Sequence, residues 1–124
     1  MTILEAITML QTVKPHQYDD NIVVKWISTL EGLIYKEVIS WHIGTGEEVA
    51  HGPYSAETDM DTVLMVPEPY SDVYIKYLTA QIDYYNGEYT RYNNSMVMYN
   101  MALSAFADWY NRTHRPSGST YIRI

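Results

Sequence analysis

Apolar residues in the first part of the chain recur at the three- and four-residue steps of amphipathic helices. A first helix is predicted over about residues 2–13, because Thr2 and Glu5 have the spacing of a capping box. Its apolar face consists of Ile3, Ala6, Ile7 and Leu10. Lys14 and Pro15 end this helix, since proline disfavours a helical conformation in the residue that precedes it.

A longer second helix is predicted after Asp19 and Asp20, whose carboxylates suit the N-terminus of a helix. Its apolar residues share one face over about six turns. They are Val23, Trp26, Ile27, Leu30, Leu33, Ile34, Val38 and Trp41. We expect the helix to bury this face, with the ring of Trp26 in the core.

The helical periodicity is lost between residues 44 and 75, where glycine and proline interrupt the chain. This stretch carries seven Asp or Glu residues and no Lys or Arg, and so matches the net charge of −7 of the whole chain. It predicts a long acidic loop. The apolar run 62–66 inside it is either a short strand or a loop segment anchored on the core, and we favour the anchor.

A third helical region begins near Ser71 and Asp72, and its apolar and aromatic residues keep an almost heptad register as far as Tyr110. The register runs through Asn86 and Gly87, so it allows one long kinked helix or two helices separated within residues 86–95. Residues 93–95 offer a second helix cap there. Because average helix lengths are short, we adopt two helices.

The end of the chain combines helix-stopping residues with a short alternating stretch. Residues 116–119 read Pro-Ser-Gly-Ser, and residues 120–124 alternate polar and apolar side chains as a strand does. The predicted fold is therefore all-α. It is a small bundle of three to four helices in one domain, residues 1–116, with a long acidic loop and an extended, flexible C-terminal tail, residues 117–124.

Composition excludes several classes of function. The 124 residues contain no cysteine, which removes disulfide frameworks, thiol catalysis and thiolate zinc sites. The acidic charge disfavours a sequence-specific nucleic-acid binder. The chain contains no apolar stretch near 18 residues, and no secretory signal pattern begins it, so we expect no membrane contact.

Candidate chemistry is sparse along the sequence. Nucleotide-binding glycine motifs and a nucleophile elbow are both missing. A metal site could be built from His42, His51, Asp59 and Asp61, which leaves a small metal- or ligand-binding enzyme or a regulatory module as an alternative. Solvated loop residues explain these positions equally well. We therefore expect no enzymatic activity, no cofactor and no metal.

Thirteen tyrosines against a single phenylalanine are the unusual feature of the composition. Tyrosine suits half-buried surfaces and subunit contacts, because its large ring carries a polar hydroxyl. The acidic loop also contrasts with the arginines near the C-terminus, which suggests head-to-tail association. The expected contact residues are Glu47, Glu48, Asp59, Asp61, Arg112, Arg115, Tyr121, Ile122 and Arg123.

Three stretches carry a resemblance to a known class of proteins. They are Gln17-Tyr18-Asp19-Asp20, Val66-Pro67-Glu68-Pro69-Tyr70, and the run from Tyr84-Tyr85-Asn86-Gly87-Glu88 through Arg91-Tyr92-Asn93-Asn94-Ser95 to Trp109-Tyr110-Asn111-Arg112. They resemble small prophage virion structural proteins of the head–tail connector (neck or adaptor) type. The resemblance covers nearly the whole chain, through helical patterns and short motifs.

The resemblance implies an α-helical subunit that assembles into a ring beneath the portal and extends the channel for the genome. The implied partners are further copies of the chain, which can be monomeric when isolated, and the portal and tail-proximal virion proteins. The implied location is the virion, and the bacterial cytoplasm during assembly. No catalytic residues carry over. Another virion assembly role, such as tail completion, is the alternative within this class.

Overall fold

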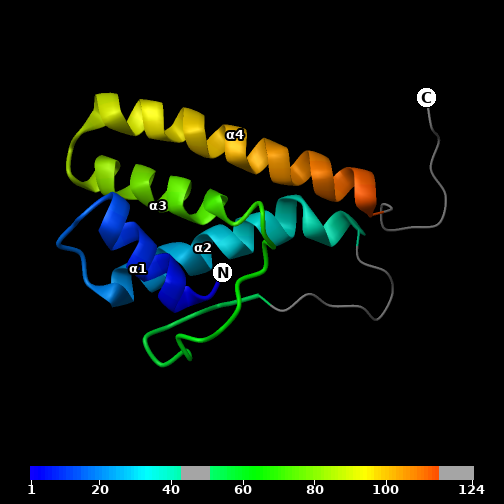
Figure 1. The fold of residues 1–124 in the computed structure, drawn as a ribbon, viewed down its shortest axis with the longest axis horizontal. Helices are drawn as coiled ribbons and strands as arrows, with labels where there is room; N and C mark the ends of the chain where they lie inside the picture. Colours follow the sequence, from blue (N-terminus) through cyan, green and yellow to red (C-terminus); the bar gives the residue numbers. More distant parts are fainter. Residues whose placement is uncertain (43–50, 115–124) are drawn as a thin grey trace.

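The computed structural model describes residues 1–42 and 51–114, which fold as a small helical bundle (Figure 1). Its elements are α1 (Ile3–Val13), α2 (Asp20–Glu37), the short 3₁₀ helix η1 (Ile39–His42), α3 (Asp72–Tyr85) and α4 (Tyr89–Thr113). The only β pairing among the described residues is an isolated bridge between Thr2 and Val63. The all-α prediction is therefore confirmed. The predicted tail, residues 117–124, lies outside the described residues.

The N-terminus of α1 is closed by the predicted capping box. The Thr2 amide donates to the Glu5 carboxylate at 2.8 Å, and the Glu5 amide donates to the Thr2 hydroxyl at 3.1 Å. These two bonds satisfy amides that have no partner within the helix. Ile3, Ala6 and Leu10 then point into the core and are fully buried.

The helix α2 is shorter than the apolar pattern predicts. Trp26 is buried as expected, but Leu33 is 44% exposed and Trp41 is 66% exposed, so the predicted burial of these two residues is wrong. The inward face instead includes Glu31, which leaves Leu33 on the outer side. After Glu37 the chain continues as η1, whose tighter winding carries Trp41 away from the face of α2.

The region from Asp72 to Thr113 forms two helices, as adopted from the sequence, but the break lies before residues 93–95. Gly87 has a φ of +77°, a conformation that glycine adopts without steric cost. Its amide donates to the carbonyl of Tyr84, and the amide of Glu88 donates to the carbonyl of Asp83, which completes a Schellman motif. The predicted second cap at 93–95 therefore lies inside α4.

The apolar run 62–66 anchors the loop on the core rather than forming a strand. Leu64 and Val66 are buried, and the Leu64 amide donates to the carbonyl of Met1 at 2.8 Å. The amide of Ile3 in turn donates to the carbonyl of Thr62 at 3.1 Å. The favoured interpretation of this run is confirmed.

The core lies between α1, α2 and α3, and α4 runs antiparallel to α3 along its outer side (Figure 1). Only Tyr99 and Phe106 of α4 are buried. Within the described residues, no helix has the length and the apolar character that a membrane span needs.

Candidate docking groove

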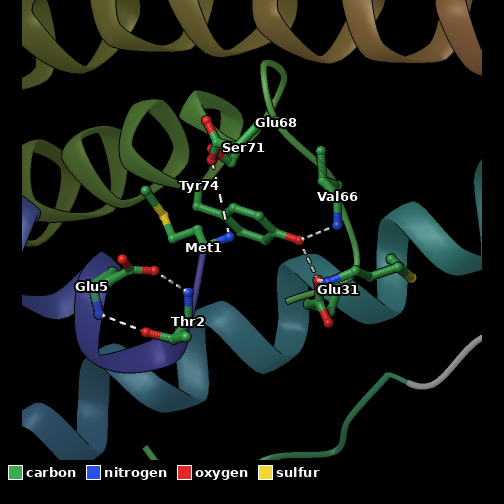
Figure 2. Close-up of polar contacts among 9 residues, drawn as sticks. Met1, Thr2, Glu5, Glu31, Val66, Glu68, Ser71 and Tyr74 are labelled. Atoms are coloured by element: carbon green, nitrogen blue, oxygen red, sulfur yellow. Dashed lines mark hydrogen bonds and ion pairs between the residues drawn. The ribbon is translucent and has the colours of Figure 1, made fainter. Parts of the chain in front are cut away.

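A buried carboxylate links the loop to two helices. Glu31 of α2 is fully buried, and its Oε1 accepts the Tyr54 hydroxyl at 2.7 Å. Its Oε2 accepts the Met65 amide at 2.8 Å and the hydroxyl of Tyr74, which itself accepts the Val66 amide at 2.8 Å (Figure 2). Three donors therefore compensate the removal of this carboxylate from water.

The two tyrosines of this cluster are held in the protonated form. Burial raises the pKa of Tyr54, and its hydrogen bond to Glu31 raises it further. Burial also raises the pKa of Tyr74, with the negative charge of Glu31 as the next cause. Both phenols consequently remain donors at neutral pH. Because Glu31 has no exposed surface, this cluster ties the loop to α2 and α3 and offers no access to a substrate.

A second buried acid joins α1 to the α3–α4 pair. The side chain of Asp83 is 2% exposed, and its Oδ1 lies 2.8 Å from Nζ of Lys14. Its Oδ2 accepts the Ser95 hydroxyl at 2.6 Å. The Lys14 ammonium also lies 3.9 Å from the carboxylate of Glu88, which is partly exposed. The sequence pattern distinguishes neither Glu31 nor Asp83 from the other acidic residues. Their only signal was an acid at a core-facing position of a helix.

The tyrosine-rich faces are divided between core and surface. Tyr74, Tyr99 and Phe106 are buried within one copy, so no second subunit is needed to cover them. Tyr85 and Tyr89, beside the α3–α4 turn, are 58% and 61% exposed. The expectation that neighbouring subunits cover these faces can hold only for the exposed rings.

A groove of about 470 Å³ opens where α1, α3 and α4 meet. Its apolar lining consists of Met1, Met9, Val13, Pro69, Ile75 and Met98, and we call it the methionine groove. Met9, Val13 and Met98 are 46%, 56% and 47% exposed. One copy of the chain therefore leaves these apolar side chains partly uncovered, whereas Ile3, Ala6 and Leu10 of α1 are buried.

The rim of the methionine groove carries charged groups of both signs. Glu68 and Asp72 line it together with Lys76, whose Nζ lies 3.6 Å from the Asp72 carboxylate. The amino group of Met1 lies 3.9 Å from the Glu68 carboxylate (Figure 2). A neighbouring hollow shares Met1, Met9 and Glu68, and adds Leu4. The hollow also includes the polar side chains of Glu5, Thr8 and Thr12, so the exposed strip along α1 is partly apolar and partly polar.

Part of the predicted acidic contact region lies beside this strip. Asp59 and Asp61 are exposed in a turn where the Asp61 amide donates to the Asp59 carboxylate at 2.9 Å. The carbonyl between them, of Met60, accepts the Leu4 amide at 3.0 Å, which fixes this turn against the start of α1. Arg112 is exposed in the last turn of α4 and forms no ion pair with either aspartate in the described part of the chain.

The remaining predicted contact residues lie outside the described residues. They are Glu47, Glu48, Arg115, Tyr121, Ile122 and Arg123. The sequence pattern does not reveal the methionine groove, because its lining comes from α1, α3, α4 and the loop. The signal available was Met9, an apolar residue beside the buried face of α1.

The described residues give no support to the alternative metal site. The ring of His51 stacks on that of Tyr35, with centroids 3.8 Å apart, while Asp59 and Asp61 lie in the turn beside α1. The side chain of His42 is outside the described part. Across residues 1–42 and 51–114, as far as they are described, no group of three or more His, Asp or Glu side chains is placed to hold a metal ion.

No protein-family model matches the chain, and neither the curated proteins nor the solved structures contain a match.

Proposed function

We propose that this protein is a non-enzymatic assembly protein of the head–tail connector (neck or adaptor) type. In this proposal its copies form a ring beneath the portal of a phage particle and extend the channel through which the genome passes. The resemblance of the three sequence stretches described above supports this class. The exposed apolar surface of the folded chain supports an assembly role.

The methionine groove is the observation that carries the proposal. Soluble monomers seldom expose contiguous apolar surface without a use for it, and such surface typically marks a contact site. Methionine is flexible and polarizable, so a groove lined by it can adapt to a partner. The groove also has a polar rim, formed by Glu68, Asp72 and Lys76, as protein interfaces generally do.

The charge of the chain fits a position beside passing DNA. The net charge of −7 repels the phosphate backbone, so a wall built from such subunits would not retain the duplex. The exposed acids Asp59 and Asp61 contribute to this charge on the described surface.

The proposal is tested by measuring molar mass with size-exclusion chromatography and light scattering. The full chain is measured over a wide range of protein and salt concentrations, alone and with a purified portal ring. We expect oligomers that grow with protein concentration, or co-elution with the portal. A chain that stays monomeric and ignores the portal under every condition would contradict the proposal.

A pair of matched variants identifies the surface responsible. Met98→Lys places a charge in the methionine groove, and Leu33→Lys places the same charge on an exposed apolar residue of α2. We expect Met98→Lys to abolish association and Leu33→Lys to leave it intact, with both variants melting near the wild-type temperature. Equal association of the two variants would exclude the groove as the contact.

A further inference from the structure

We propose that two copies of this chain pair through the outer face of α4, with the two helices antiparallel about a two-fold axis. The inference goes beyond the proposed ring, because the contact involves neither α1 nor α3 and can form without any other virion protein. Both copies present the same surface to each other, so the contact closes at the dimer.

In the described part of the chain, α4 packs mainly against α3 and turns its opposite side outward (Figure 1). Six exposed residues follow one another along α4 in steps of four and three residues. These steps average 3.6 residues, so the six side chains form a straight line along the helix. At about 100° per residue, this line lies opposite the buried Tyr99 and Phe106. The six residues, which we call the α4 stripe, are Thr90, Asn94, Val97, Met101, Ser104 and Asp108.

The α4 stripe is apolar at its centre and polar at both ends. Val97 and Met101 at the centre are 56% and 63% exposed. Such neighbouring apolar side chains on the surface favour a contact that covers them. The polar residues on either side of them have a second role, because polar side chains within a helix pair fix its register at some cost in stability.

The order of residues in the α4 stripe is complementary to its own reverse. In an antiparallel pair whose axis passes level with residue 99, apolar side chains face each other at the centre. An amide faces a hydroxyl in the next layer, and a hydroxyl faces a carboxylate at each end. Each polar layer therefore contains a donor and an acceptor. The facing pairs are Val97 with Met101, Asn94 with Ser104, and Thr90 with Asp108.

Charge favours the antiparallel arrangement over a parallel one. Asp108 is exposed, and it forms no ion pair within the described residues. In the antiparallel pair it lies opposite Thr90 of the other copy and next to Arg91, whose side chain is 68% exposed. A parallel pair would bring the two Asp108 carboxylates together, and like charges in a contact repel. The self-complementary order and this charge distribution point to a second copy as the occupant.

Opposite charges introduced at position 90 test the contact in the full-length chain. Thr90→Lys places an ammonium opposite Asp108 of the other copy, and Thr90→Glu places a carboxylate there. We expect the dimer of the Lys variant to be about threefold tighter than the wild type and that of the Glu variant about tenfold weaker. Sedimentation velocity over a range of protein concentrations measures both.

Two controls separate this effect from folding and from net charge. Position 90 lies in the first turn of α4, where a carboxylate stabilises the helix and an ammonium weakens it, so an effect through folding would have the reverse order. Leu33→Lys and Leu33→Glu change the net charge equally on an exposed side of α2. Adding Asp108→Lys to the Thr90→Glu variant should restore dimerisation. Equal association of the two Thr90 variants would overturn the contact.

Cysteine crosslinking tests the register independently. The chain contains no cysteine, so Asn94→Cys and Ser104→Cys each introduce a single thiol. In the antiparallel pair these two positions face each other, whereas equivalent positions lie about 15 Å apart along the helix axis. Under mild oxidation we expect a mixture of the two variants to form mainly the mixed disulfide. Disulfides mainly between identical variants would indicate a parallel pair, and the absence of any disulfide would exclude the contact.

The outcomes distinguish this contact from the proposed function. If the wild type forms large oligomers or binds the portal but the Thr90 variants associate equally and no mixed disulfide forms, the α4 contact is wrong and the assembly function stands. If the predicted variant effects and the mixed disulfide are found but the wild type stops at the dimer and ignores the portal, the contact stands and the ring is wrong. A wild type that is monomeric throughout overturns the contact. Met98 lies beside the α4 stripe as well as in the methionine groove, so it is left unchanged in these experiments.

Discussion

The cluster around Glu31 and the methionine groove are both places where separate segments of this chain meet. They differ in whether their side chains are covered within one copy. At Glu31 the carboxylate receives three hydrogen bonds from the loop and α3 within one copy. In the groove, Met9, Val13 and Met98 remain about half exposed. The chain therefore satisfies its polar interior within one copy, whereas this apolar surface stays open in the same copy. Substitutions around Glu31 should therefore affect stability, and substitutions in the methionine groove should affect association.

The largest effect on stability is expected from Glu31→Ala. The substitution leaves the hydroxyls of Tyr54 and Tyr74 and the Met65 amide without their acceptor in the interior. We expect the free energy of unfolding to fall by about 3–5 kcal/mol, as measured by urea denaturation. Glu31→Gln keeps the volume and one acceptor oxygen, so its loss should be smaller. An Ala variant as stable as the wild type would show that the cluster does not hold the fold.

A smaller loss is expected from Lys14→Met. It leaves the buried carboxylate of Asp83 with the Ser95 hydroxyl as its remaining side-chain partner. Because the Lys14 side chain is partly solvated, we expect about 1–3 kcal/mol of destabilisation. Lys25→Met, on the exposed side of α2, is the matched control and should change stability by less than about 0.5 kcal/mol. Equal unfolding midpoints for the two variants would contradict this account.

The buried phenols predict a loss of stability at alkaline pH. Burial raises the pKa of Tyr99 from 10.0 to about 12, with nearby Tyr77 as the next cause, and the pKa values of Tyr54 and Tyr74 are also raised. Above pH 10 the unfolded chain releases these protons while the folded chain retains them, so rising pH favours unfolding. The contribution of Tyr99 is present below pH 10 and is lost as the pH rises to about 12.

Denaturation curves measured at several pH values check the alkaline prediction. We expect the free energy of unfolding to decrease across this range, and Tyr99→Phe to make the decrease shallower because it removes one of the titrating hydroxyls. A slope that is the same in the Phe variant would show that Tyr99 does not contribute.

The smallest effect on stability is expected in the methionine groove. Val13→Ser shortens a side chain that is 56% exposed, so the free energy of unfolding should change by no more than about 0.5 kcal/mol. Self-association should nevertheless weaken, because the lost apolar surface belongs to the contact. Sedimentation velocity and a melting curve on the same sample measure both properties. A large drop in melting temperature would place Val13 with the core instead.

The helices could be predicted because their causes are local. The capping box at Thr2 and Glu5 and the glycine at position 87 act within a few residues. The sequence pattern therefore locates the capping box, and it places the break at Gly87 within residues 86–95. The 3.6-residue period also identified Trp26 as a core residue. It could not tell how α2 rotates about its axis, which is decided by packing against α1 and α3. Leu33 was therefore assigned to the core and Glu31 was not.

The candidate site could be predicted only in part, because it depends on contacts between distant segments. The exposure of Asp59 and Asp61 follows from a local turn. The methionine groove requires Val13, Ile75 and Met98 to come together, which no local pattern encodes. The division of the tyrosine-rich faces also depends on contacts between helices. Tyr99 of α4 is buried, whereas Tyr89, at the start of the same helix, is exposed.

The unequal lengths of α3 and α4 have a consequence for any assembly of this chain. At about 1.5 Å per residue, α4 measures about 37 Å and α3 about 21 Å. The part of α4 that extends beyond α3 packs against the ring of Tyr70. The centroid of that ring lies 6.2 Å from the Phe106 centroid and 5.2 Å from the Trp109 centroid. In the assembly that we propose, this end of α4 would project beyond the α3–α4 pair toward a neighbouring subunit. Removing one turn from α4 would then shorten the projection by about 5.4 Å.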